Sequence, residues 1–377
     1  MDKSNILNRN YVKELSDYIL DPAVRNVMVN GLYSSAKSFA ISASVSKGVH
    51  VVILNRKEEA AGCINDLYNL IGEDNVFFFP PSKDFSTKVQ RTSAVGAVID
   101  YKNKKSEFPF VVLVGYKDSF EEGVLEEGLL KKSIVSIKVG DNISHEFLKE
   151  VLFDSAFTKV DFVSQPGEFA IRGSIIDVFS YGDNQPYRID FFGDEIESIK
   201  LFNANTQRSE KEIKSLDIYP NITSSQDSSY TVSVFDFLPE DSVIWVAGVD
   251  KVDRYFSDHK HIYLSTLGNE NIPYDKLITF RTEPQPTFNK HFEVLADDIR
   301  AKREEGFSVY ILSESISQIE RLKSIFSTHN LVLNYKNYTI HEGFVDFDSK
   351  ICLYTDHQIF DRYRRLKLKR SVERSER

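Results

Sequence analysis

Three short apolar runs set the pattern of the N-terminal part of the chain: VRNVMVNGL at residues 24–32, VHVVIL at 49–54 and FPFVVLVGY at 108–116. Between them lie segments with helical spacing, such as KEEAAGCINDLYNLIG at 57–72. Short apolar strands that alternate with helices are typical of a parallel sheet covered on both faces. Residues 1–118 are therefore predicted to form an α/β domain.

The pattern changes after this domain. From Lys159 to about Lys200 a dense series of short strands is expected, separated by turn signals such as Gln165-Pro-Gly167. Turns at this spacing are typical of antiparallel hairpins. Residues 119–204 are therefore predicted to be a small antiparallel α+β domain that is inserted into the first one.

The rest of the chain is interpreted as two further segments. Residues 205–281 carry weaker signals, including a helix at DKVDRYF (250–256), and are predicted to complete the first sheet. The α/β pattern restarts in residues 282–377 with two helices, the second capped by Ser313, and ends in a basic linker. The predicted fold class is α/β and multidomain: a parallel-sheet domain built from two segments, an inserted antiparallel α+β domain, and a second small α/β domain.

Composition limits the function classes. The 377 residues hold 47 Lys and Arg against 56 Asp and Glu, a formal net charge of −9. Such a chain lacks the basic field that drives nucleic-acid binding, so any DNA contact must be local. Cys63 and Cys352 lie far apart and outside any Cys/His cluster, which argues against a disulfide framework and a zinc site. With no signal-peptide pattern and no membrane-length apolar run, a cytoplasmic protein without a membrane partner is predicted.

The segment Gly31-Leu-Tyr-Ser-Ser-Ala36-Lys37-Ser38 lies between an expected strand and an expected helix, where a phosphate loop would lie. Phosphate loops read G-x-x-x-x-G-K-[S/T], because backbone amides curl around phosphate oxygens while the lysine and the hydroxyl reach the outer phosphates and Mg²⁺. Lys37 and Ser38 fit, but Ala36 replaces the second glycine, and no carboxylate ends a neighbouring strand to hold Mg²⁺. We predict a degenerate loop, kept as a structural turn, that binds no cofactor.

Strand alternation between residues 167 and 200 places Arg172, Arg188 and Phe192 on one solvent-facing side of the inserted domain. Two interpretations stay open. The first is a solvated sheet face with one stray aromatic side chain. The second is a protein-binding patch, because arginine and aromatic side chains are common interface anchors. As surface residues, they are expected to affect stability little when replaced.

No catalytic or metal-binding residues are predicted. His259 and His261 share one extended segment but have no third ligand nearby in the sequence. Asp194 and Glu195 follow a glycine and are interpreted as turn residues, and no Ser/His/Asp or Cys/His arrangement stands out.

Several sequences resemble a known family. GEFAIRGSIIDVF (167–179), YRIDFFGDEIESIKLF (187–202) and NTQRS (205–209) are similar to the module shared by the excision repair protein UvrB and the bacterial transcription-repair coupling factor family. A UvrB-type protein would carry an intact phosphate loop and a tyrosine-rich hairpin that threads DNA. Here the hairpin region reads FFFPPSKDFSTKVQRTS (77–93) and has no tyrosine, while HEGFVD at 341–346 is similar to the coupling-factor family.

The resemblance implies a UvrB-like α/β domain in two segments, with an inserted domain that contacts the damage-recognition protein UvrA. The positions that match the contact residues of the family are Arg172, Arg188 and Phe192. Full-length members continue into an RNA-polymerase-binding domain and a DNA translocase that uses ATP and Mg²⁺, and the motifs of that translocase are missing here. The resemblance therefore implies an N-terminal fragment that would reach RNA polymerase and DNA only through the missing domains.

Three functional hypotheses follow. The favoured one is a non-catalytic module that recruits UvrA to lesions where RNA polymerase has stalled, for nucleotide excision repair. The alternative is a fragment of a UvrB-like, ATP-dependent DNA-damage helicase, against which Ala36 and the short loop in 77–93 argue. The third is a scaffold that mainly restrains the translocase of the full-length protein.

Overall fold

The computed structural model describes residues 6–7, 9–222, 231–248, 258–265 and 272–362. The helix expected at 250–256 and nearly all of the basic segment expected at the end of the chain lie outside these residues. No helix within the described ranges is both long enough and apolar enough to span a membrane.

The chain divides into two compact units. The first contains residues up to 77, 107–117 and those from 239 onward, and the second contains 78–106 and 118–238. A large parallel sheet and several smaller sheets, each accompanied by helices, confirm the predicted multidomain α/β class.

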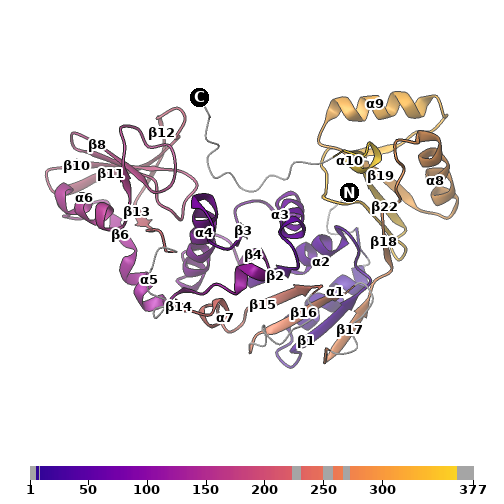
Figure 1. The fold of residues 1–377 in the computed structure, drawn as a ribbon, viewed down its shortest axis with the longest axis horizontal. Coiled ribbons are helices and arrows are strands. Elements are labelled where there is room, and N and C mark those ends of the chain that lie inside the picture. The colour runs from indigo at the N-terminus through magenta and orange to yellow at the C-terminus, as the bar shows by residue number, and fades with distance from the viewer. Residues whose placement is uncertain (1–5, 8, 223–230, 249–257, 266–271, 363–377) are drawn as a thin grey trace. The chain divides into compact units, whose positions relative to one another are not determined.

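A parallel sheet lies at the centre of the first unit, and its described strands follow the order β17-β1-β16-β15-β2-β4-β3 (Figure 1). The strands are β1 (Asn26–Asn30), β2 (Gly48–Leu54), β3 (Val76–Phe78), β4 (Phe110–Tyr116), β15 (Val243–Ala247), β16 (Lys260–Ser265) and β17 (Lys276–Thr279). Neighbours from β17 to β4 pair in parallel. The late strands therefore complete the sheet that the early strands begin.

The centre of this sheet is buried on both faces, as its uninterrupted apolar strands predict. Every residue of β2 and β15 is buried. The unit also contains the helices α1 (Arg9–Leu20), α2 (Ala36–Ser44) and α3 (Lys57–Ile71), and α2 packs against both others.

One polar pair joins β2 to β15 inside the sheet. The indole Nε1 of Trp245 donates a hydrogen bond to Nδ1 of His50 at 3.1 Å, and both side chains are fully buried. The other ring nitrogen, Nε2, therefore carries the proton and donates to the carbonyl oxygen of Lys47 at 3.0 Å. Burial disfavours the charged imidazolium and lowers the pKa of His50 to about 4.

A second sheet in the first unit has the described order β18-β21-β22-β19-β20. Its elements are β18 (Thr282–Pro284), α8 (Phe292–Glu304), β19 (Ser308–Leu312), α9 (Ile316–Ser327), β20 (Asn334–Lys336), β21 (Phe344–Asp346), β22 (Ile351–Thr355) and α10 (Asp356–Ile359). The cap of α9 differs from our expectation. The hydroxyl of Ser315 accepts from the Gln318 amide, whereas the Ser313 hydroxyl donates to the buried Asp356 carboxylate.

The second unit is built around a sheet with the described order β12-β11-β10-β9-β8-β7. Its strands are β7 (Thr158–Lys159), β8 (Glu168–Arg172), β9 (Ile175–Val178), β10 (Tyr187–Phe192), β11 (Glu195–Phe202) and β12 (Ser209–Ile213). The pairs from β8 to β12 are antiparallel, as predicted, while β7 runs parallel to β8.

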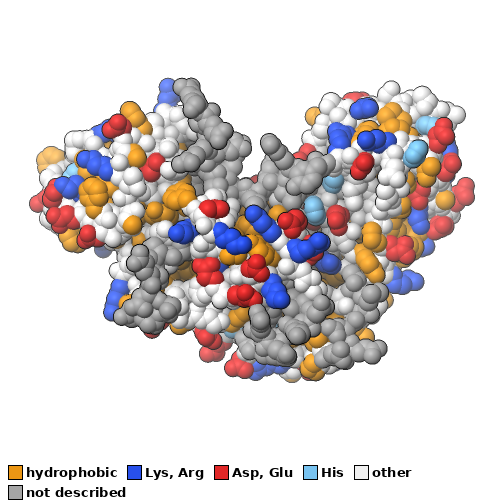
Figure 2. Space-filling view, in the orientation of Figure 1, with side chains coloured by type: hydrophobic (Ala, Val, Ile, Leu, Met, Phe, Trp, Pro, Cys, Tyr) orange, Lys and Arg blue, Asp and Glu red, His pale blue; other side chains and the backbone are white. Residues whose placement is uncertain are grey.

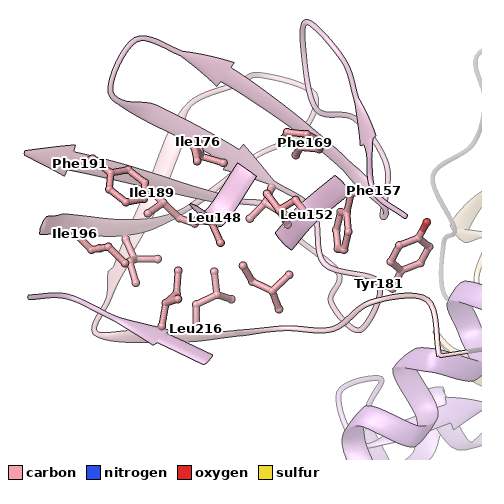
Figure 3. Packing of buried hydrophobic residues seen from close by; sticks show 14 of the residues in the cluster. Leu148, Leu152, Phe157, Phe169, Ile176, Tyr181, Ile189, Phe191, Ile196 and Leu216 are labelled. Carbon is pink, nitrogen blue, oxygen red and sulfur yellow. The ribbon is translucent and has the colours of Figure 1, made fainter. Parts of the chain in front are cut away.

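Helix α6 (His145–Asp154) covers one face of this sheet. Its Leu148 and Leu152 point at Phe169, Ile189 and Phe191 of the strands, as Figure 3 shows. The opposite, α6-free face carries the alternate residues of the same strands.

The second unit contains further elements besides this sheet and α6. They are α4 (Phe85–Lys102), β5 (Val124–Leu125), α5 (Glu127–Ser133), β6 (Val135–Lys138), β13 (Ser215–Ile218), β14 (Thr231–Val232) and α7 (Val234–Phe237), and a 3₁₀ helix (Lys117–Phe120) follows β4. Strand β12 pairs with β11 and β13 pairs with β6. Both β12 and β13 lie beyond the predicted boundary at residue 204. Leu216 and Ile218 of β13 are buried in the α6 core, so the sheet domain extends past that boundary.

Candidate functional site

Strand β10 shows the alternation that the sequence predicts. Ile189 and Phe191 are buried in the α6 core, whereas Phe192 is 78% exposed. A register shift lies between Asp190 and Phe191, yet the burial pattern keeps its period of two across it. Arg188 and Phe192 therefore lie on the face away from α6.

Both predicted arginines bind the same buried carboxylate, that of Asp177 on β9. Arg188 lies directly opposite Asp177 in the strand register and holds it in a two-pronged contact, Nε to Oδ1 at 2.7 Å and Nη2 to Oδ2 at 2.9 Å. From β8, Nη2 of Arg172 donates to Oδ2 of the same side chain. Asp177 is fully buried. The structure thus brings Arg172 and Arg188 together through a residue that the prediction did not include.

The shared carboxylate changes the electrostatics of the face. Two guanidinium groups and one carboxylate leave a single net positive charge. The hydrogen bond to Asp177 is the main reason why the pKa of Arg188 is raised. A buried carboxylate without cations would be costly, so Arg188 is a structural residue as well as a candidate contact. This contact argues against the expectation that its replacement would leave stability untouched.

Aromatic rings flank both guanidinium groups. The Arg188 guanidinium lies 4.7 Å from the ring centre of the buried Phe202, and that of Arg172 lies 5.3 Å from the ring centre of Phe162. Phe162 is itself 62% exposed. We call Phe162, Arg172, Arg188 and Phe192, with Asp177 beneath them, the arginine face.

The arginine face is not a plainly solvated sheet surface. A small apolar cluster of Val163, Ala170, Phe179 and Phe202 covers part of it, next to the buried Asp177. What stays open to solvent is a rim of Phe162, Arg172 and Phe192, because Arg188 is mostly covered. Exposed aromatic and arginine side chains around a rigid, satisfied centre are typical of protein-binding surfaces.

Sequence reasoning missed Asp177 and Phe162. A charged residue inside the apolar run IIDVF was a visible signal for the first. Its partners, however, depend on which residues face each other across β8, β9 and β10, and this register comes from the structure. Phe162 lies outside the strands, in the segment between β7 and β8, where alternation gives no information.

The degenerate phosphate loop lies between β1 and α2, where the sequence placed it. Gly31 has a positive φ of 75°, and a Cβ at this position would lie 1.9 Å from the carbonyl oxygen of Phe280. Ala36 and Ser38 begin α2 and are buried. The Ser38 hydroxyl bonds to the thiol of Cys63, whose pKa burial raises to about 12. Ser38 is therefore engaged by Cys63, and both residues line the cavity beside the loop.

The cavity beside this loop is small and of mixed charge. It measures about 190 Å³, and its walls include Lys37 and Arg56 but also the carboxylates of Glu59, Asp66 and Glu342. Pockets for small molecules usually measure ~300–1,000 Å³. These residues fit a nucleotide poorly, because the negative groups would repel phosphate.

The remaining predicted candidates carry structural contacts. Nε2 of His259 lies 2.9 Å from the carbonyl oxygen of Pro239, and His261 stacks on Tyr263. Among the described residues, no group of three or more His, Cys, Asp or Glu side chains could hold a metal ion. Positive and negative side chains are mixed over the visible face of the molecule (Figure 2).

Comparison with known proteins identifies the sheet domain of the second unit. Residues 135–223, from β6 to just beyond β13, match the family model of the UvrB interaction domain. These residues are similar to a UvrB interaction domain, and that name is used below for residues 135–223. The arginine face belongs to it entirely, and the match begins and ends later than the predicted inserted domain at 119–204.

The matches to three curated relatives are each longer than residues 135–223. The transcription-repair-coupling factor of Bacillus subtilis (strain 168) is 27% identical over 219 residues, 56% of this chain and 19% of the relative. That of Escherichia coli (strain K12) is 32% identical over 109 residues, 29% of this chain and 10% of the relative. That of Staphylococcus aureus (strain USA300) is 26% identical over 312 residues, 77% of this chain and 26% of the relative.

The resemblance to coupling factors seen in the sequence is thereby confirmed, and the chain around the UvrB interaction domain is related to these proteins. The chain spans about a quarter or less of the length of the relatives named here.

Proposed function

We propose that this chain is part of a transcription-repair-coupling factor and that its UvrB interaction domain binds UvrA, which it recruits to stalled RNA polymerase. The observation that carries the proposal is the arginine face: two arginines held by one buried carboxylate and bordered by exposed aromatic rings. The family match to an interaction domain supports a binding role for this region.

The geometry of the arginine face favours binding. A long arginine side chain normally loses rotamer freedom when it joins an interface, which weakens association. Asp177 already holds both guanidinium groups in place, so less freedom remains to be lost. Because Asp177 neutralises one of the two charges, affinity for UvrA should fall with salt less steeply than for two free arginines.

We also propose that this chain does not hydrolyse ATP. Ala36 and the carboxylates around the cavity oppose a triphosphate, and the Ser38 hydroxyl is engaged by the Cys63 thiol. In the whole protein, translocation with ATP and Mg²⁺ and the contacts with RNA polymerase and DNA would belong to regions that this chain does not contain. A cytoplasmic location follows from that role.

The UvrB-like helicase hypothesis is disfavoured by residues 77–93. Most of this segment is the start of α4, which a capping box of Asp84 and Thr87 begins. Arg91 is buried and donates to the carbonyl oxygens of Pro80, Ser119 and Glu122. A capped helix anchored by a buried arginine leaves no hairpin within the described part of this segment that could thread DNA.

Titration of purified UvrA against the wild-type chain and single variants tests the binding proposal. Arg172→Ala and Phe192→Ala are each expected to weaken binding by about 2 kcal/mol, about 30-fold in affinity. Phe147→Ala is the matched control, because Phe147 is an exposed aromatic residue on α6, on the other face of the sheet. Unchanged affinity in both test variants, with unchanged melting, would show that the arginine face is not the UvrA surface.

A further inference from the structure

Two motifs noted in the sequence, the degenerate phosphate loop and the HEGFVD segment, meet inside the first unit. The backbone amide of Glu342 donates to the Ser35 hydroxyl at 2.9 Å, and that of His341 donates to Oδ1 of Asp66 at 2.6 Å. The side-chain amide of Asn69 donates to the carbonyl oxygen of Thr339 at 2.9 Å. The segment 339–342 thus lies across the loop and α3 and is held there by hydrogen bonds to its backbone.

Two of these three bonds have a polarity that is the reverse of a nucleotide site, and Asn69 donates the third. A phosphate loop offers backbone N–H donors to an anion. Here Ser35 and Asp66 offer acceptors, and the donors come from the peptide that lies on them. Ser35 precedes α2 but does not cap it, so its hydroxyl is available for the Glu342 amide. This chemistry suits an extended peptide rather than a phosphate.

The shape of α3 also fits the segment. A Cβ at Gly62 would lie 2.2 Å from Cδ2 of the His341 ring, so the absence of a side chain makes room for the imidazole. Glycine weakens a helix relative to alanine, and close packing gives this one a reason. Beside it, the ring of Phe39 on α2 meets Phe344 edge-on at 5.5 Å.

The backbone of the loop itself is engaged by a later part of the chain. The Thr282 hydroxyl donates to the carbonyl oxygen of Gly31 at 2.7 Å and accepts from the amide of Tyr33 at 2.9 Å. Thr282 begins β18, in the same five-stranded sheet that HEGFVD enters through β21. The loop therefore contacts that sheet at two separate points.

We infer that the degenerate phosphate loop and α3 form a socket whose ligand is the segment 339–342 of the same chain. The socket fastens the five-stranded sheet to the parallel sheet, and His341 and Glu342 narrow the cavity beside the loop, where a nucleotide would otherwise approach. The loop pattern has kept its position in the fold while its ligand has changed from phosphate to peptide.

Gly62→Ala tests the socket in the full 377-residue chain. The added methyl group collides with the His341 ring, so the amides of His341 and Glu342 should exchange with deuterium about tenfold faster. Gly128→Ala is the matched control, because it places the same methyl group on a helix with nothing nearer than 4.0 Å. Both variants gain helix propensity, so only the collision distinguishes them.

A double variant separates collision from general damage. In a His341→Ala background there is no ring to displace, so Gly62→Ala should cause no further acceleration of exchange. Ser35→Ala should also speed exchange of the Glu342 amide. Ser42→Ala is the control and should not, because Ser42 lies on α2 and its hydroxyl donates to the carbonyl oxygen of Phe39 in the same helix. Unchanged exchange in both Gly62→Ala and Ser35→Ala would overturn the socket.

Inorganic tripolyphosphate probes the competing ligand. A socket occupied by peptide should leave exchange of residues 339–342 unchanged at millimolar tripolyphosphate. Faster exchange of these amides with the anion present would show that phosphate displaces the segment, and the inference would fail. This experiment involves no UvrA, so its outcome is independent of the binding proposal.

Discussion

The arginine face and the phosphate-loop socket both began as short sequence motifs with basic side chains, but the rest of the chain treats them differently. On the arginine face, Asp177 neutralises one charge from below and leaves Phe162, Arg172 and Phe192 open. In the socket, the backbone of residues 339–342 is bound to Ser35 at the end of the loop and to α3 beside it. Whether a motif is available to a partner therefore depends on what packs against it.

The largest difference between the two regions should be their response to acid. His50 lies in the sheet that carries the loop, and its pKa is lowered to about 4 from an ordinary value of ~6.5. Between pH ~6.5 and about 4, the imidazole of His50 is protonated in the unfolded chain but neutral in the folded chain. The free energy of unfolding is therefore highest above pH ~6.5 and decreases as the pH falls toward 4. The loss should reach about 3 kcal/mol.

The measurement is urea unfolding at several pH values, with His50→Gln for comparison. The variant has no imidazole to protonate, so its stability should change less over the same pH range, whatever its stability at neutral pH. An equal slope for variant and wild type would mean that His50 does not cause the acid sensitivity.

Arg188→Ala should show that the arginine face has a structural centre. Removal of this guanidinium leaves the buried Asp177 with Arg172 alone, and we expect a stability loss of about 2 kcal/mol. Arg188→Lys keeps a cation but loses the two-pronged contact, so it should recover only part of the loss. Thermal melting of the UvrB interaction domain measures both, and an unchanged melting temperature for Arg188→Ala would contradict the structural role.

Phe162→Ala should give the smallest effect and defines the edge of the arginine face. The ring stacks on Arg172 and is largely exposed, so its removal should weaken UvrA binding by about 1 kcal/mol, about fivefold, and barely change melting. Phe147→Ala again serves as the control. Equal affinity for Phe162→Ala and wild type would place the boundary of the surface at Arg172.

Local patterns predicted the elements of this fold well because they need only neighbouring residues. The apolar runs at β1, β2 and β4 and the alternation in β10 could be recognised in the sequence alone. The extent of the sheet domain could not. Strand β13 has only four residues and is recognisable only through its pairing with β6, which lies far from it in the sequence.

The site was predictable to the same degree. Arg172, Arg188 and Phe192 follow from period-two alternation on two strands. Asp177 required the cross-strand register, and the phosphate-loop socket required a contact between residues 35 and 342. The misplaced cap at Ser313 has a similar cause, because the buried Asp356 that engages it comes from α10. Charge pairs and packing partners distant in sequence decide these features.

The hydrogen bond between Trp245 and His50 spans 195 positions of sequence, and β15 stands directly beside β2. Because β16 lies between β1 and β15, the parallel sheet of a nascent chain stays open until residue 265 has been synthesised, after the whole UvrB interaction domain. Closing so long a loop is entropically costly and makes this a slow, late event, which prior folding of the intervening domain would ease. Trp245 is the one tryptophan of the chain, so its fluorescence reports the moment at which β15 packs beside β2.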